Sequence, residues 1–222
     1  MTAAEWRIGL EGLETRAIFE PATTVRPAAT FVFAHGAGGH KSDQGMSALA
    51  GRFRSIGLNV VRFNFPYRER GSGRPDQMPV LEGCIGAVVA RARAELDPGA
   101  LVIGGRSMGG RAASMLVAKG FACDGLLLLG YPLHPAGKPE KLRDAHLASI
   151  TIPVLCINGT RDKLCDRDLM EQVLQRVGPS WTMHWLEGAD HSFRVLKSSG
   201  RTDAAVLDEV AETTERWAAS LR

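Results

Sequence analysis

The chain has 222 residues, of which 45% are hydrophobic and 23% are charged, and its formal net charge is +3 at pH 7. These proportions are ordinary for a soluble globular protein, and the length fits one domain over residues 1–222. The small net charge gives no reason to expect a nucleic-acid partner, and apolar runs such as 125–131 are far shorter than the roughly 20 residues that span a bilayer, so we expect no membrane segment.

Along the chain, strand-like apolar runs alternate with segments of helical periodicity. The predicted strands cover residues 6–10, 15–20, 30–35, 59–63, 100–104, 124–130, 153–158 and 181–186. The predicted helices cover residues 44–56, 80–96, 108–119, 166–177 and 202–221. This alternation predicts an α/β fold, with a mostly parallel, doubly wound sheet of about seven to eight strands and helices on both faces.

Two segments interrupt the alternation. Residues 64–79 are rich in Arg, Gly and Pro, which predicts a long irregular loop. Residues 131–150 are rich in Pro and form a second excursion from the sheet, with one short predicted helix over 140–148.

The cysteines give no sign of a metal site or of a disulfide framework. Cys84, Cys123, Cys156 and Cys165 show no CxxC spacing and no metal-like grouping with histidine. The N-terminus carries Glu5 and lacks the apolar segment of a signal peptide. We therefore expect reduced thiols, a cytoplasmic location and no metal, while the oligomeric state stays open between monomer and homodimer.

The most informative motif is Gly-Arg-Ser-Met-Gly at residues 105–109, directly after the apolar run 101–104. A G-x-S-x-G pattern between a strand and a helix is typical of a nucleophile elbow, which presents a serine hydroxyl at the top of a parallel sheet. The glycines are needed because the turn is tight and side chains there would collide with neighbouring backbone. Ser107 is therefore the candidate nucleophile. The alternative is an ordinary helix N-cap, a position that favours serine.

Two more polar residues follow predicted strands, at the edge of the sheet where ligands of open α/β sheets bind. Asp162 comes after the strand 153–158, and His191 comes after the strand 181–186. A serine hydroxyl needs a base to accept its proton, histidine suits that task, and a buried carboxylate orients the histidine. The sequence thus predicts Ser107 as nucleophile, His191 as general base and then acid, and Asp162 as the orienting acid.

Three other acids compete with Asp162 for the orienting role. Asp166 and Asp168 lie where a helix begins, and capping or first-turn positions explain them better. Asp190 adjoins His191 in the sequence, where neighbouring side chains usually diverge. Asp162 remains the preferred candidate.

The predicted chemistry also needs preorganised donors for a developing oxyanion. The elbow supplies the backbone N–H of Met108, and the glycine-rich stretch 36–39 supplies a second N–H, which we assign to Ala37. A phosphate loop is the alternative for this stretch, but the Gly-Lys-Ser/Thr of the Walker pattern does not follow it.

Four further residues are candidates for contact with a substrate. Arg68 and Arg70 lie in the basic loop 64–79, where guanidinium groups can pair with a carboxylate or phosphate. A solvated polar loop is the alternative for these arginines. His35 precedes the glycine turn, which it can also hold by hydrogen bonding, and Leu133 is expected near the mouth of the pocket.

The chain resembles the α/β-hydrolases over nearly its whole length, on the strings FAHGAGG, GGRSMGG, GTRD and GADHSF and on the order serine, acid, histidine. More narrowly, it resembles the hydrolase-like family that includes testis-expressed protein 30 and part of the KAT8 regulatory NSL complex subunit 3. That resemblance rests on FAHGAGGHKSD, FNFPYRERGSGRPD, GGRSMGGR and GYPLHPAGKPEKLRDAHL. Dienelactone hydrolases are a more distant resemblance, and they commonly carry cysteine where this chain has Ser107.

The resemblance implies that residues 131–150 stand where many α/β-hydrolases insert a lid, so we expect a very short lid-like insertion. Together with the site residues it predicts a serine hydrolase that cleaves a carboxylic ester, or a thioester or amide, of a small molecule without a cofactor. The alternative is a hydrolase-like protein-interaction module that retains the triad. A dehalogenase would need aspartate at the elbow, and Ser107 argues against it.

Overall fold

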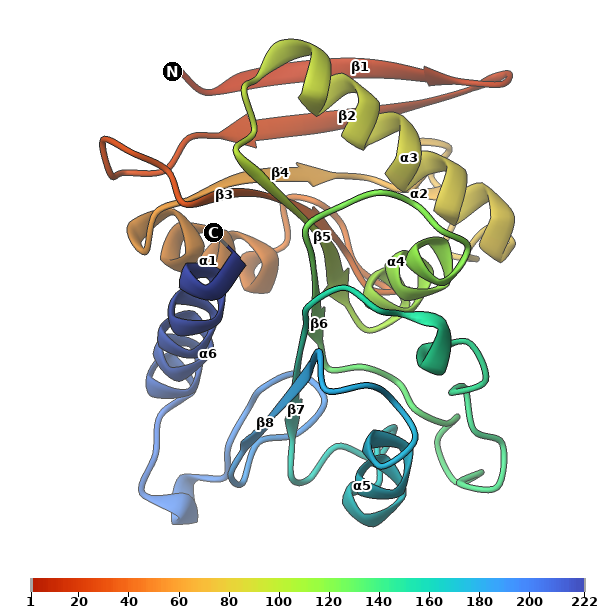
Figure 1. Cartoon of the computed structure of the whole chain (residues 1–222), viewed down its shortest axis with the longest axis vertical. Helices are drawn as coiled ribbons and strands as arrows, with labels where there is room; N and C mark the ends of the chain where they lie inside the picture. The colour runs from red at the N-terminus through yellow and green to blue at the C-terminus, as the bar shows by residue number, and fades with distance from the viewer. Residues whose placement is uncertain (1, 222) are drawn as a thin grey trace.

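The computed structural model describes residues 2–221, which fold around one eight-stranded sheet (Figure 1). In spatial order the strands run β1-β2-β4-β3-β5-β6-β7-β8. The first two strands form an antiparallel edge, β2 also pairs antiparallel with β4, and all pairs from β4 to β8 are parallel. The strands are β1 (Ala4–Leu10), β2 (Leu13–Glu20), β3 (Ala29–Ala34), β4 (Leu58–Phe63), β5 (Ala100–Arg106), β6 (Gly125–Leu129), β7 (Val154–Gly159) and β8 (Trp181–Leu186).

Helices cover both faces of this sheet (Figure 1). One face carries α1 (Gln44–Ser55) and α6 (Asp203–Ala218), and the other carries α3 (Met78–Glu95), α4 (Met108–Ala118) and α5 (Arg167–Leu174). Successive residues of a strand point to opposite faces, so Val102 joins the core under α1 and α6, whereas Ile103 joins the core under α3 and α4. The predicted α/β-hydrolase fold, mostly parallel and doubly wound, is confirmed.

The segments between the long elements contain only short helical turns, and two of these segments differ from the prediction. The loop 64–79 contains a helix, α2 (Pro66–Glu69), which begins at a proline whose fixed φ suits a first helical turn. The predicted helix over 140–148 is wrong, because only the 3₁₀ turn Leu147–Ser149 forms there. Two further 3₁₀ turns cover Lys197–Ser199 and Ala219–Leu221.

Tertiary hydrogen bonds explain why the segment 140–148 does not become a helix. The Arg143 N–H donates to the Leu133 carbonyl at 2.7 Å, and the Arg143 carbonyl accepts from the Tyr131 hydroxyl at 2.6 Å. These bonds use both backbone groups of Arg143 outside any helical ladder. The segment 131–150 is therefore tied down on the protein instead of forming a separate helix.

The parallel strands bring four distant parts of the chain to one edge of the sheet. Their carboxyl ends lead into the glycine-rich stretch 36–39 after β3, Ser107 after β5, Asp162 after β7 and His191 after β8. In the described residues no helix is both long and apolar enough to cross a membrane.

Candidate active site

Ser107 occupies a strained turn between β5 and α4. Its φ of 48° and ψ of −113° lie outside the regions that a side-chain-bearing residue normally adopts. The turn is held from two sides, because the Ser107 N–H donates to the Leu129 carbonyl at 2.9 Å and the Arg111 N–H donates to the Ser107 carbonyl at 3.0 Å. The backbone geometry is that of a nucleophile elbow.

The two glycines of the motif are required by the close approach of β3. A Cβ atom on Gly105 would lie 2.2 Å from the Ala34 carbonyl oxygen, and one on Gly109 would lie 2.6 Å from the His35 carbonyl oxygen. Both distances are far below van der Waals contact, so a larger residue at Gly105 would push β5 away from β3, and one at Gly109 would push α4 away from the end of β3.

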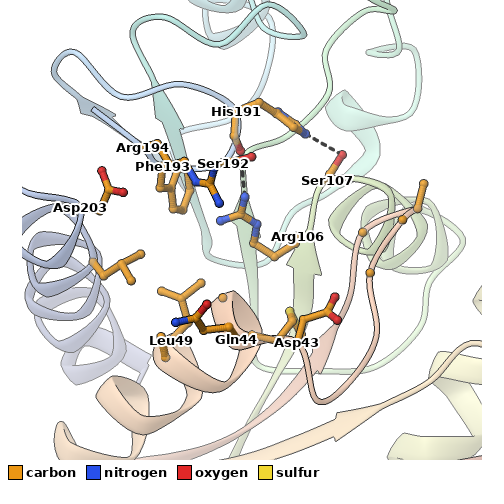
Figure 2. Close-up of a pocket in the computed structure, with 18 residues that line it drawn as sticks. Asp43, Gln44, Leu49, Arg106, Ser107, His191, Ser192, Phe193, Arg194 and Asp203 are labelled. Carbon is orange, nitrogen blue, oxygen red and sulfur yellow. Dashed lines mark hydrogen bonds between the residues drawn. The ribbon is translucent and has the colours of Figure 1, made fainter. Parts of the chain in front are cut away.

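The side chains of Ser107, His191 and Asp162 form one continuous chain of hydrogen bonds. His191 Nε2 lies 2.9 Å from Ser107 Oγ, and His191 Nδ1 lies 2.8 Å from Asp162 Oδ2 (Figure 2 shows the serine–histidine pair). The Asp162 side chain has 0% exposure. A carboxylate only accepts hydrogen bonds, so Nδ1 carries the hydrogen and the Nε2 lone pair of the neutral ring faces the serine hydroxyl. The ring is thus poised to take the hydroxyl proton.

The Asp162 carboxylate is also held by donors that sequence reasoning did not single out. Asn158 Nδ2 donates to Oδ2 at 3.1 Å, and the Leu164 N–H donates to Oδ1 at 2.8 Å. The amide of Asn158 is fixed in turn by the Tyr131 backbone, whose N–H and carbonyl each lie 3.0 Å from it. The signal for Asn158 was its place near the end of a buried strand, four residues before Asp162.

The three competing acids are engaged elsewhere. Asp166 caps α5 by accepting from the Leu169 N–H at 3.0 Å, and Asp168 lies in the first turn of that helix. Asp190 Oδ1 accepts from two backbone N–H groups of its own loop, at 2.8 and 3.0 Å. The structure brings Asp162 to the imidazole and gives these acids local roles.

The glycine-rich loop after β3 lies beside Ser107 and is fixed by two hydrogen bonds. The Tyr67 hydroxyl donates to the Ala37 carbonyl at 2.6 Å, and the Gly39 N–H donates to the Gly36 carbonyl at 2.9 Å. Within residues 2–221, the backbone N–H groups of Ala37 and Met108 donate to no protein acceptor. Both donors are therefore available to a ligand next to Ser107.

His35 supports this loop from the interior, which corrects the prediction that it contacts substrate. The side chain is fully buried, Nδ1 donates to the Gly36 carbonyl at 2.7 Å, and Nε2 accepts from the Phe65 N–H at 3.1 Å. Burial disfavours the charged ring and lowers the pKa of His35 to about 4. A neutral ring with both nitrogens occupied has no group left for a substrate.

The other three predicted substrate contacts are also not among the residues that line the cavity at Ser107. Arg70 forms an ion pair with Asp76, in a loop that folds back on itself around α2. Arg68 is directed along the same loop toward the Ser72 carbonyl at 3.4 Å. Leu133 is fully buried in the core on the α3 and α4 face, so it does not form the mouth of the pocket.

A cavity of about 670 Å³ opens in front of Ser107. Its walls come from the glycine-rich loop, the start of α1, the loop after His191 and the start of α6 (Figure 2). Arg106, the residue between Gly105 and Ser107, also lines it, and sequence reasoning gave Arg106 no role. Its Nη2 donates to the His191 carbonyl at 2.8 Å, and its guanidinium lies 4.4 Å from the centre of the Phe193 ring. Within residues 2–221 no three His, Cys, Asp or Glu side chains are grouped as a metal site would require.

The sheet order and the strained elbow define an α/β-hydrolase fold, and the comparisons with known proteins agree. Residues 27–219 match the family described as "Alpha/beta hydrolase domain", and the chain belongs to this family. The narrower group suggested by the sequence strings is not established by these comparisons.

Solved structures from several bacteria share this fold. An α/β serine hydrolase homologue from Coxiella burnetii is 17% identical with a TM-score of 0.77, and the match covers 97% of each chain. An α/β serine hydrolase without a lid from Xanthomonas campestris is 19% identical with a TM-score of 0.75, covering 97% of this chain and 94% of that one. A dienelactone hydrolase from Anabaena variabilis is 18% identical with a TM-score of 0.70, covering 98% and 97%.

Proposed function

We propose that this protein is a serine hydrolase that cleaves a carboxylic ester of a small molecule, or less readily a thioester or amide, through an acyl-enzyme on Ser107. The observation that carries the proposal is the chain of contacts at 2.9 and 2.8 Å from the Ser107 hydroxyl through His191 to the buried Asp162 carboxylate. Nothing else in the fold requires these three residue types at the ends of three different strands.

In the proposed reaction His191 Nε2 takes the hydroxyl proton while Ser107 Oγ attacks the ester carbonyl carbon. The negative charge that develops on the carbonyl oxygen accepts hydrogen bonds from the N–H groups of Ala37 and Met108. His191 then returns the proton to the leaving alcohol, and water, activated by the same histidine, releases the acid from Ser107. Asp162 keeps the imidazole oriented and stabilises its charged form.

The cavity and the structural relatives support this reaction class. A volume of about 670 Å³ falls within the range of small-molecule sites. The Coxiella and Xanthomonas relatives are described as α/β serine hydrolases, and a further relative, from Rhodothermus marinus, is described as an esterase domain. These names support a hydrolase, while the ester preference rests on the site geometry of this chain.

Covalent labelling tests the proposal. Incubation with a fluorophosphonate should add one adduct to the intact mass of the protein, and the adduct should be lost in Ser107→Ala. Ser192→Ala is the matched control, because Ser192 lines the same cavity but its hydroxyl makes no hydrogen bond to His191 among the described residues. The Ser192→Ala variant should still be labelled.

The same experiment separates the enzyme from the rival, a hydrolase-like interaction module. A folded wild-type protein that stays unlabelled at millimolar probe and hydrolyses no p-nitrophenyl ester would contradict the enzyme proposal and favour the module. A labelled protein with measurable turnover on short acyl esters would support it.

A further inference from the structure

Arg106 places a cation inside the cavity, next to the proposed nucleophile. Figure 2 shows it beside Ser107, with its guanidinium directed toward the loop that carries His191 and Phe193. A guanidinium has five N–H donors. Within residues 2–221 the Arg106 side chain makes a single hydrogen bond, from Nη2 to the His191 carbonyl. Most of its donors therefore remain available to an occupant of the cavity.

The charge of Arg106 has no ion-pair partner among the described residues. The two acids that act on it most strongly are Asp162, which holds His191, and Asp190, which accepts backbone N–H groups. Burial still lowers the pKa of the Arg106 guanidinium to about 10, against the effect of both carboxylates. The Arg106 side chain is half-buried, and a cation partly withdrawn from water without a close anion is less favourable than a fully solvated one, so an anionic ligand would offset part of that cost.

We propose that Arg106 determines specificity by binding a carboxylate of the substrate, so that the preferred substrates are half-esters of dicarboxylic acids. This inference rests on the proposed ester hydrolysis at Ser107 and adds a substrate class to it. A planar guanidinium pairs with a carboxylate through two parallel hydrogen bonds. Because Arg106 and Ser107 line the same cavity, a molecule bound with its ester at Ser107 can place a carboxylate against Arg106.

The other charged residues of the cavity indicate that the preference for a carboxylate comes from direct contact with Arg106 and not from long-range attraction. Arg194 lines the cavity with Asp43 and Asp203, and all three are exposed. The two aspartates already accept backbone N–H groups, from His40 at 2.7 Å and from Val195 at 2.9 Å. Together with Arg106 these charges sum to about zero, so they give little steering of an anion. The preference should accordingly change little with salt.

A purely structural role for Arg106 makes a different prediction. The hydrogen bond to the His191 carbonyl and the contact with Phe193, whose φ is +62°, also hold the histidine loop in place. If that were the whole role, removing the guanidinium would slow all substrates alike. The ratio of rates on a charged and a neutral substrate separates the two roles, because loop disorder cancels in the ratio.

The test compares monoethyl adipate with the ethyl ester of adipamic acid, which replaces the carboxylate by a neutral amide. In the wild type we expect kcat/KM to favour the carboxylate by roughly 10- to 100-fold, the effect of one charged hydrogen-bonded pair. Arg106→Gln should bring the ratio close to one, and Arg106→Lys should keep part of it. Arg70→Gln is the matched control, since Arg70 is paired with Asp76 outside the cavity, and it should keep the ratio.

The outcomes separate this inference from the proposed function. Hydrolysis of both esters at equal kcat/KM overturns the inference and leaves ester hydrolysis standing. If neither ester is hydrolysed, calorimetric titration of both compounds into the wild type and Arg106→Gln tests the carboxylate site directly. A Kd for monoethyl adipate at least about tenfold tighter than for the amide, with the difference lost in Arg106→Gln, supports the carboxylate site. Equal Kd values, or no binding of either compound, overturn it.

Discussion

At the scale of single residues, the Asp162 carboxylate shows how tightly the site is specified. It accepts hydrogen bonds from three fixed donors, the His191 ring, the Asn158 amide and the Leu164 N–H. An asparagine at position 162 would have to place an NH₂ group against one of these donors. The resulting conflict favours the wrong tautomer of the His191 ring, with its hydrogen on Nε2.

We therefore expect Asp162→Asn to lower kcat on an ester substrate by at least about 100-fold while the fold is kept. Steady-state kinetics measure the rate, and circular dichroism checks the fold. Asp166→Asn is the matched control, because asparagine caps a helix as well as aspartate does, and its activity should stay close to that of the wild type. Full activity in Asp162→Asn would transfer the orienting role to another acid.

Some residues of the site could be predicted from the sequence and others could not, for a physical reason. Ser107 could be predicted because a nucleophile elbow requires glycines close to the serine in the sequence. Arg106 gave no local signal, since its contact reaches the His191 carbonyl 85 residues away. Asn158 gave only its place near the end of a strand, because the Tyr131 backbone that fixes its amide lies 27 residues away. For His35 the expected hydrogen bond to the glycine turn is present, whereas the predicted substrate contact is wrong, because the second ring nitrogen binds Phe65, which lies 30 residues away.

At the scale of elements, apolar periodicity was sufficient for the strands and the long helices of this α/β fold. The segment 140–148 had the composition of a helix, but the backbone of Arg143 is bonded to Tyr131 and Leu133 instead. Hydrogen bonds to distant partners replaced the local ladder, and periodicity contains no information about such partners. The end of β3 at Ala34, one residue before the predicted end, is an ordinary difference in a strand boundary.

The close approach of α4 to β3 makes a prediction about glycine in a helix. Gly109 lies in the first turn of α4, where a Cβ atom would meet the His35 carbonyl oxygen at 2.6 Å. We expect Gly109→Ala to lower the free energy of unfolding by at least about 2 kcal/mol, because the overpacked helix must shift. Urea denaturation measures the change, and ester turnover should fall with it because Ser107 precedes this helix.

The matched control is Gly83→Ala in α3, where the position is exposed and a Cβ atom would have nothing within 4 Å. Alanine is the better helix former, so this substitution should raise the free energy of unfolding by up to about 1 kcal/mol. If both variants gain stability, the close contact between α4 and β3 is absent in solution.

At the scale of the whole molecule, the stability of the fold is linked to the site through His35. This buried ring joins the glycine-rich loop to the chain after β4, through the Gly36 carbonyl and the Phe65 N–H. Its pKa is about 4 in the folded protein and about 6.5 when the chain unfolds. Between these values the unfolded chain binds more protons, so the contribution of His35 is complete above pH 6.5 and is lost as the pH falls toward 4.

We expect this linkage to remove about 3 kcal/mol from the free energy of unfolding between pH 7 and pH 4. Other groups titrate over the same range, so the measurement is a comparison of variants by urea denaturation at both pH values. Glutamine can donate and accept hydrogen bonds but does not ionise, and His35→Gln should therefore shrink the difference between the two pH values by that amount. Gly83→Ala should shift stability equally at both pH values, because it changes no titrating group. An unchanged difference in His35→Gln, or an NMR titration of the His35 ring near pH 6.5, would mean that the ring is solvated in the folded protein.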